Sequence, residues 1–326
     1  MRKILLPLLL AVAIILAVQF FITPKQSAAA LFSLANNSLM LINADNQQTV
    51  AANIAARLYD QQDDFAVYAE TIKEQLTASE AIGSGDLWLI NKQATIHKQL
   101  INDKNVIDAL IALRSQKIFY LTNEAKLFSM SFDGANIATI ADKVMSPTIS
   151  ADEKFLTYQK LADNWQSNDY FENSRGIFIF NLTTNKERQI TNSPEDFAPI
   201  FSPKATKIIF NSLSPEGLAS FFIVDTTSNN RKQLTNLGQK FVTNTTVPIP
   251  TEQPSWSPNG KYLIFESDNE IWLLEFAADL NSILRSQRIS FGKSPTWNQD
   301  GKIISILTNT SPKNIINVDV NGNLVQ

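Results

Sequence analysis

The chain has 326 residues, 44% hydrophobic and 18% charged, with a formal net charge of −3 at pH 7. This composition is typical of a globular protein with enough apolar material for a sizeable core. After residue 30 the chain carries 25 basic and 31 acidic groups, and no run of Lys or Arg stands out. A nucleic-acid partner is therefore not expected. Cysteine is absent, which excludes disulfides, thiolate metal sites and a Cys nucleophile.

The start of the chain predicts export. Arg2 and Lys3 precede an uncharged stretch over residues 4–22, and Ala28-Ala29-Ala30 follows it. A helix of these 19 residues would span about 28 Å, close to the thickness of a bilayer's hydrocarbon core. That length favours an uncleaved anchor, whereas the Ala28-x-Ala30 pattern favours cleavage after Ala30. We predict a signal peptide or membrane anchor over residues 1–30, although a buried core helix is a third interpretation.

Short apolar runs that end in a polar residue recur along the rest of the chain and define a repeat. Their first residues advance by 48, 40, 50, 44, 50 and 44 positions. The seven runs cover residues 39–43, 87–91, 127–131, 177–181, 221–225, 271–275 and 315–319. Such a period leaves room for about four short strands in each repeat.

Other segments recur in phase with these runs. A segment that begins with Pro and ends in a polar residue precedes four of them, at residues 147–150, 199–202, 254–257 and 295–298. A Lys follows each of these prolines after seven or eight positions. Asn259-Gly260 and Asp300-Gly301 supply the positive φ angles of tight hairpin turns between Pro and Lys. Short polar strands close the repeats, for example at residues 98–100, 188–191, 232–235 and 287–290.

These patterns predict the fold class. Runs rich in β-branched and aromatic residues, separated by Asn, Gly and Pro, indicate antiparallel four-stranded sheets. Arranged radially, each such sheet buries both faces against its neighbours. We therefore predict an all-β, seven-bladed β-propeller of four-stranded antiparallel blades over residues 31–326, preceded by the N-terminal hydrophobic helix. A β-solenoid would show a shorter period, and two sandwiches would not keep seven copies in phase.

The strand count leaves the closure of the ring open. Residues 31–35, 39–43 and 48–54 supply the second, third and fourth strands of the first blade. Nothing after residue 30 supplies its innermost strand. Either residues 324–326 close the ring, or the first blade has only three strands.

Residues 254–261, with the sequence PSWSPNGK, and residues 232–235, with the sequence KQLT, resemble the WD40-like repeat of TolB-type periplasmic propellers. The resemblance is clear over residues 144–320, with weaker copies of the first segment at 199–207 and 295–302. It implies a propeller of a family that includes envelope proteins, and similar propellers precede prolyl-oligopeptidase-type hydrolase domains. TolB carries an α/β domain before its propeller, whereas we expect only a propeller here, so the resemblance implies no particular partner.

The residues for several kinds of catalysis are missing or isolated. No two of the 10 glycines lie four positions apart, which excludes a Gly-x-Ser-x-Gly elbow. His97 is the only histidine, and we expect an exposed position at the start of an outer strand. A site with several His ligands is therefore excluded, and no Asp-x-Asp calcium loop is visible. We expect no catalytic residue, no metal and no cofactor.

The remaining acids and tryptophans have structural interpretations. Asp63-Asp64 and Asp152-Glu153 fall where hairpin turns are expected, and Asp225, Glu275 and Asp319 end equivalent strands. Glycoside chemistry needs two carboxylates that face each other, and the sequence does not say which acids converge on the axis. Four tryptophans fall at repeat positions and are predicted to be core: Trp88, Trp256, Trp272 and Trp297.

A polar insertion over residues 161–173 contains Trp165, Tyr170 and Phe171 between two strands of its blade. Exposed aromatic residues on long loops are common in recognition surfaces. We predict that these three residues bind the ligand, although packing of the loop on itself is the alternative. In a four-stranded meander, the loops between the second and third strands and the connectors between blades emerge on one face of the ring. The long segments 74–85, 161–175, 211–219 and 238–253 all belong to that class, whereas the other face has mostly tight turns, residues 277–285 excepted.

The sequence therefore predicts a non-catalytic, monomeric binding module outside the cytoplasm. Its ligand would be a protein, peptide or glycan in the envelope or outside the cell. The module would be anchored to the membrane through residues 4–22, or periplasmic or secreted after cleavage near Ala30. The alternative is a propeller hydrolase or lyase that uses carboxylates or a bound metal in the central channel. A sensor or scaffold component, with activity on another chain, is a third possibility.

Overall fold

The computed structural model describes residues 31–325, apart from 36–37, 43–46, 53–56, 71–83, 164–173, 214–217, 236–238, 241–253, 299 and 311–313. All regular elements in these residues are β-strands. Across the same residues, no helix is long and apolar enough to cross a membrane. The hydrophobic helix predicted over residues 4–22 lies outside this part of the chain and stays a prediction.

The first half of the described chain forms two sheets. A three-stranded sheet, in the order β1-β2-β3, contains β1 (Leu31–Ala35), β2 (Ser38–Ile42) and β3 (Gln48–Ala52). A seven-stranded sheet follows, in the order β10-β9-β8-β7-β6-β5-β4. Its strands are β4 (Arg57–Gln62), β5 (Phe65–Ala69), β6 (Gly85–Asn91), β7 (His97–Ala112), β8 (Lys117–Thr122), β9 (Leu127–Ser131) and β10 (Ala138–Ala141).

The second half forms four sheets, each antiparallel and sequential. The first contains β11 (Val144–Ile149), β12 (Phe155–Leu161), β13 (Ser174–Asn181) and β14 (Lys186–Gln189). The second contains β15 (Asp196–Phe201), β16 (Lys207–Leu213), β17 (Leu218–Asp225) and β18 (Arg231–Gln233), with β19 (Gln239–Lys240) beside β17. The third contains β20 (Ser255–Trp256), β21 (Tyr262–Ser267), β22 (Glu270–Phe276) and β23 (Ile283–Phe291). The last contains β24 (Lys293–Trp297), β25 (Ile303–Leu307) and β26 (Ile315–Asp319).

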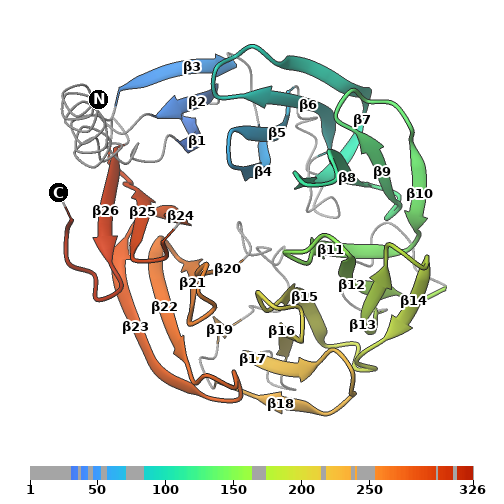
Figure 1. Ribbon diagram of the computed structural model, residues 1–326, viewed down its shortest axis with the longest axis vertical. Coiled ribbons are helices and arrows are strands. Elements are labelled where there is room, and N and C mark those ends of the chain that lie inside the picture. Colours follow the sequence, from blue (N-terminus) through green and yellow to red (C-terminus); the bar gives the residue numbers. More distant parts are fainter. Residues whose placement is uncertain are drawn as a thin grey trace, which may run out of the picture.

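The sheets stand around a common axis in chain order, which is a β-propeller arrangement (Figure 1). The first sheet (blue) lies beside the last (red). The described residues form six sheets rather than seven separate ones, because β7 pairs with β6 through its first half and with β8 through its second. We call the two parts that share this strand the β4–β7 unit and the β7–β10 unit. The predicted propeller is thus confirmed as an arrangement of sheets.

The polar residue that ends each Pro-led segment caps the hairpin turn behind it. The side-chain oxygen of this residue accepts the backbone N–H five positions later, at 2.9 to 3.1 Å. The four pairs are Ser150 with Phe155, Ser202 with Lys207, Ser257 with Tyr262, and Asn298 with Ile303. The repeat motif therefore encodes a hairpin, because the cap satisfies an amide that the turn leaves without a strand partner.

Aromatic residues of the motif pack between neighbouring sheets. The Phe155 and Phe201 ring centroids lie 6.5 Å apart, and those of Tyr262 and Trp297 lie 6.2 Å apart. The four tryptophans predicted as core are half-buried and pack at the edges of hydrophobic clusters. These contacts match the prediction that each sheet buries both faces against its neighbours.

The ends of the ring close by side-chain packing. Ile42 on β2 packs with Leu307 and Ile315 of the last sheet, and Met40 packs against the same cluster. Leu324 forms a bridge with Val318, and the Val325 N–H donates to Asn317 O at 2.9 Å. The C-terminal residues therefore extend the last sheet and do not supply an inner strand to the first. Of the two closures left open by the sequence, the described residues match the three-stranded first sheet.

Gln61 on β4 covers part of the free edge of β1. Its side-chain amide accepts the Phe32 N–H at 3.0 Å and donates to Phe32 O at 3.1 Å. Both hydrogen bonds of a ladder position are thus made by one side chain. This pairing satisfies the backbone groups of a buried residue where the repeat would place another strand.

Replacing the buried cap Ser257 by Ala should destabilise the protein by about 1–2 kcal/mol. The Tyr262 N–H would lose its acceptor at 2.9 Å, and Ser257 is 0% exposed, so water cannot replace it easily. Denaturant unfolding of S257A and of the exposed control S282A measures the difference. Equal free energies of unfolding for the two variants would contradict the capping role.

Candidate functional site

The strand ends that flank several long connections lie on one face of the ring. The segments 71–83, 164–173 and 214–217 join the second and third strands of their units, and 241–253 lies between β19 and β20. Antiparallel succession of the strands places the ends of such connections on the same face. We call this the loop face. Trp165, Tyr170 and Phe171, the predicted binding residues, lie in 164–173 and therefore outside the described residues.

A buried polar network lies in the β4–β7 unit. The Tyr68 hydroxyl lies 2.9 Å from Glu70 Oε1 and 2.6 Å from His97 Nε2. Tyr68 is 0% exposed, whereas the His97 side chain is 38% exposed. Burial raises the pKa of Tyr68, and the Glu70 carboxylate adds to the rise. The sole histidine, predicted as an exposed strand residue, is indeed at the surface, and it also contacts this buried hydroxyl.

Asp86 extends the network toward the loop face. Its Oδ1 accepts the Glu70 N–H at 2.8 Å, and its Oδ2 accepts from Trp88 Nε1 at 3.1 Å and Gln99 Nε2 at 3.0 Å. Glu70 and Asp86 are 8% and 3% exposed. Both carboxylates therefore lie buried on either side of the 71–83 connection, at its base.

The same arrangement recurs near the end of the chain. Trp272 Nε1 donates to Glu270 Oε2 at 3.2 Å, and Arg288 pairs with the other oxygen of this carboxylate. Trp88 and Trp272 occupy matching places in their sheets, each two residues after the acid. An acid–tryptophan pair therefore occurs at the same strand position in two sheets, with different partners for the acid.

A β-bulge turns two consecutive side chains of β4 toward the β7–β10 unit. The register of β4 on β5 shifts between Leu58 and Asp60. The Tyr59 hydroxyl donates to Val106 O at 2.7 Å, and Asp60 Oδ2 accepts the Ile111 N–H at 2.8 Å. Both bonds reach the second half of β7, which is consistent with the way a bulge redirects side chains.

Asp108 lies on the same half of β7, also at a bulge. It is half-buried, and its Oδ1 accepts the adjacent Ala109 N–H at 2.8 Å. Burial raises the pKa of Asp108 to about 7, although Arg57 opposes the rise, and the Asp60 carboxylate adds to it. Burial likewise raises the pKa of Asp60. Two neighbouring innermost strands thus each contribute an acid whose charged form is disfavoured.

Tyr59 connects the two groups of acids. Burial raises its pKa, Arg57 opposes the rise, and the carboxylates of Asp108 and Asp86 add to it. The carboxyl groups of Asp60, Glu70, Asp86 and Asp108 therefore lie in one region of the two units. Arg57 and His97 are the basic residues that interact with this region. Among the described residues no three His, Cys, Asp or Glu side chains are grouped so as to hold a metal ion. The arrangement is suited to holding protons or polar groups.

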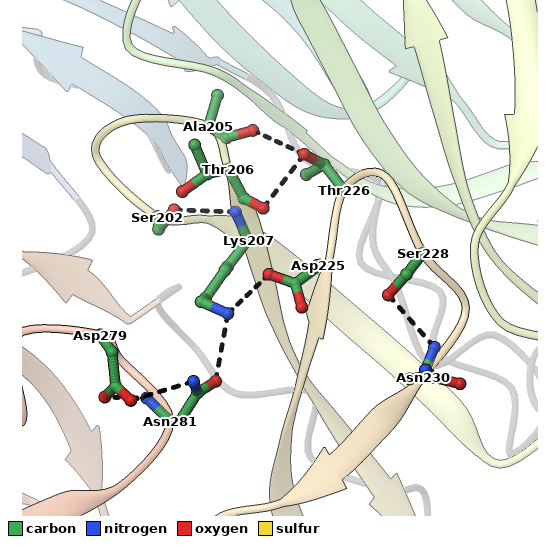
Figure 2. Close-up of polar contacts among 10 residues, drawn as sticks. All are labelled: Ser202, Ala205, Thr206, Lys207, Asp225, Thr226, Ser228, Asn230, Asp279 and Asn281. Carbon is green, nitrogen blue, oxygen red and sulfur yellow. Dashed lines mark hydrogen bonds and ion pairs between the residues drawn. The ribbon is translucent and has the colours of Figure 1, made fainter.

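The opposite face carries contacts between neighbouring sheets (Figure 2). Lys207 Nζ donates to Asp225 Oδ1 at 2.6 Å and to Asn281 Oδ1 at 3.1 Å. Asn281 belongs to the longer turn between β22 and β23 and is held by Asp279, whose carboxylate accepts its backbone N–H and its side-chain N–H. The exceptional turn on this face therefore joins two sheets, and Asp225 has the structural role predicted for it.

Residues 97–326 match the TolB β-propeller domain family. The chain belongs to this family. The match begins within β7 and continues through the last sheet, so it includes the segments whose Pro-led motif indicated the resemblance.

Several solved structures have a similar fold. Hydrazine synthase of Kuenenia stuttgartiensis has a TM-score of 0.58 at 13% identity, over 91% of this chain and 94% of that one. TolB from Acinetobacter baumannii has a TM-score of 0.52 at 13% identity, over 90% and 77%. An oligogalacturonate lyase in complex with manganese has a TM-score of 0.54 at 10% identity, over 83% of each chain. At these identities the likeness extends to the fold alone.

The network around Tyr68 and Asp108 was not predicted from the sequence. One signal for part of it is present, because Asp108 interrupts an otherwise apolar run over residues 106–112. The turn acids were predicted correctly, since Asp63-Asp64 and Asp152-Glu153 lie in hairpin turns. The difference is that a turn has a local signature, whereas a junction between two units depends on their packing.

Tyr68 and His97 should be energetically coupled by about 1 kcal/mol in a double-mutant cycle of Y68F, H97A and the double variant. The hydroxyl and the imidazole lie 2.6 Å apart, so each single change removes the same contact. Denaturant unfolding supplies the four free energies. The cycle of Y68F with K98A is the control, and equal coupling in both cycles would contradict a specific Tyr68–His97 contact.

Proposed function

We propose that this protein is a non-catalytic extracytoplasmic β-propeller that binds a protein, peptide or glycan. The observation that carries the proposal is membership of the TolB β-propeller domain family over residues 97–326. The positively charged start and the uncharged stretch over residues 4–22 support export. Export would leave the protein anchored by that stretch, or periplasmic or secreted after cleavage near Ala30. We further propose that it acts as a monomer.

We also infer seven blades for the ring. The β4–β7 unit and the β7–β10 unit share β7. If β7 is counted in both units, each unit contains four strands. His97 to Ile101 of this strand pair with β6, and Val106 to Ala112 pair with β8. One continuous strand would then serve as the outer strand of one blade and the inner strand of the next.

The loop face is the proposed binding surface. The strand ends that flank the long connections lie on this face, and loops on a rigid scaffold commonly carry recognition residues. Trp165, Tyr170 and Phe171 belong to one of these connections and provide the large aromatic area that binding hot spots favour. The buried side chains of Glu70 and Asp86, which flank another connection in sequence, add polar groups near the same face.

The triple variant W165A/Y170A/F171A should lose at least tenfold in partner capture, since hot-spot side chains contribute on the order of 2 kcal/mol each to binding. Its melting temperature should stay that of the natural protein. Capture would be measured by immobilising the protein and quantifying what it retains from an extracytoplasmic fraction. The matched control is V50A/I137A/L284A, which truncates three side chains exposed by 54 to 63% on outer strands or, for Ile137, just before one. Equal capture by both triple variants would contradict the loop assignment.

Expression of the full chain, followed by membrane fractionation and N-terminal sequencing, should find the protein outside the cytoplasm. A mature start at Leu31 in the soluble fraction indicates cleavage, and an intact Met1 in the membrane fraction indicates an anchor. Either result agrees with the proposed location. A soluble cytoplasmic product with an intact Met1 would contradict it.

One observation favours the second candidate, a propeller hydrolase or lyase. Asp60 and Asp108 lie on neighbouring innermost strands, and the pKa of Asp108 is raised to about 7 by burial. A carboxyl group with such a pKa can give and take a proton near neutral pH. If D108N loses a hydrolase or lyase activity of the natural protein but still captures the ligand, this candidate is favoured over the binding module.

A further inference from the structure

The described chain enters the ring on the face opposite the loop face. β1 occupies the place of a second strand, because Gln61 covers its edge where the repeat would place an inner strand. The second strand of each unit ends at the loop face, where the connection to the third strand begins. Leu31, the first residue of β1, therefore lies at the opposite face. We call this opposite face the turn face.

The exposed large aliphatic residues among the described residues lie near the turn face. The outermost strand of each unit begins there, because it runs antiparallel to a third strand that begins at the loop face. Ile96 and Ile137 directly precede the outermost strands β7 and β10, and Leu284 is the second residue of β23. Leu324 follows the turn after β26, and Val50 lies in the middle of β3. These five residues, which are 38 to 73% exposed, are called the aliphatic rim.

The aliphatic rim extends over five successive units of the ring (Figure 1). These are the β20–β23 sheet, the last sheet, the first sheet, the β4–β7 unit and the β7–β10 unit, so the sheet that begins at Leu31 is the middle one. The outermost strands of the other two sheets, β14 and β18, expose charged side chains instead. Single exposed aliphatic residues are common on protein surfaces. Their concentration at one end of the outermost strands, in one arc of the ring, indicates a surface that contacts something apolar.

The sequence before Leu31 identifies that apolar partner. Eight residues, 23–30, separate Leu31 from the uncharged stretch over residues 4–22. Fully extended, eight residues span at most about 29 Å. A bilayer that holds residues 4–22 therefore lies within this distance of Leu31, on the side of the ring where the aliphatic rim is exposed. Exposed aliphatic side chains at such a place can be buried at the boundary of headgroups and acyl chains.

The charges of the turn face favour a neutral lipid surface. Its turns between first and second strands carry exposed acids and bases together, for example Asp63, Asp152 and Lys204. Attraction to anionic lipids depends on clusters of Lys and Arg. Mixed charges do not provide it, whereas burial of aliphatic side chains does not depend on the charge of the lipid.

We propose that the turn face lies on a lipid bilayer, with the aliphatic rim inserted at its surface, and that the loop face points away from the membrane. The inference rests on the proposed export of the protein and adds the face and the residues that contact the lipid. It does not depend on the ligand of the loop face, so partner capture and membrane contact can fail separately.

The test uses the full chain, whose lack of cysteine allows labelling at single introduced cysteines. L284C and F291C place a label near the two ends of β23, at positions where the natural residues are 63% and 61% exposed. Each variant carries an environment-sensitive fluorophore and is reconstituted into phosphatidylcholine vesicles that contain a doxyl-labelled lipid as quencher. We expect at least threefold stronger quenching at position 284 than at position 291. Equal quenching, or stronger quenching at position 291, would overturn the proposal.

A second experiment changes the aliphatic rim itself. V50E/I137E/L324E, made in the L284C chain, places three carboxylates where the proposal requires apolar contact with lipid. Quenching at position 284 should fall by half or more, because transfer of a charged group out of water is unfavourable. The three positions are exposed, so the variant should keep the Tm of the natural protein.

The matched control T184E/T227E/N230E adds the same charge to the same face. Its three positions are exposed in turns of the two sheets that have no part of the aliphatic rim. Quenching at position 284 should be unchanged in this control. An equal loss in both triple variants would show a general effect of charge and overturn the proposal.

A second copy of the chain is the other occupant that could cover the aliphatic rim. Energy transfer between labels at position 284 of different copies, unchanged when the vesicles are diluted with lipid, would indicate that contact and overturn the proposal. If the chain is cleaved after Ala30, the product is tested by co-sedimentation with the same vesicles. Binding is expected through the aliphatic rim, and its absence would overturn the proposal as well.

Discussion

The structure depends on one constraint: every sheet has two apolar faces, and only the adjacent sheets can cover them. The ring must therefore close, and among the described residues no strand is shared between its ends. Ile42, Leu307 and Ile315 contribute to that closure by packing together. At the inner edge Gln61 supplies both hydrogen bonds of a ladder position to Phe32. One glutamine thus satisfies the backbone of a buried residue in a three-stranded sheet, and the sheet keeps its place in the ring.

Polar contacts between neighbouring sheets recur on the face opposite the loops, as the apolar contacts do inside. At three places a Lys or Arg side chain on an outer strand donates to a backbone carbonyl in a hairpin turn of the neighbouring unit. Lys98 reaches Asp133 O, Arg188 reaches Thr226 O, and Arg285 reaches Val320 O. A backbone acceptor requires no particular residue in the partner turn. Such contacts can therefore form between neighbouring units whose turn sequences differ.

The sequence was sufficient for the propeller arrangement because its signals are local and repeated. The Ser257–Tyr262 cap, the Asn259-Gly260 turn and the alternation of apolar residues each appear within a few positions of one another. The joining of two units through β7 was not predicted, since the polar cluster at residues 102–105 is typical of a turn between two short strands. The contact of Tyr59 and Asp60 with the second half of β7 was missed for a related reason. Asp60 and Ile111 are 51 positions apart, and only packing brings them within 2.8 Å.

The polar network lies where the repeat motif is weakest. Sheets after residue 144 carry the Pro-led segment, whereas β4 and the second half of β7 have Tyr59, Asp60 and Asp108 around their bulges. In β11, β15 and β24 the bulge is instead formed at a Ser-Pro or Ala-Pro pair, with positive φ at Ser146, Ala198 and Ser294. A bulge in the innermost strand is thus part of the fold, and the two units without the proline have acidic residues at this bulge. A structural feature common to the ring has become, in one sector, a place for ionisable groups beside the axis.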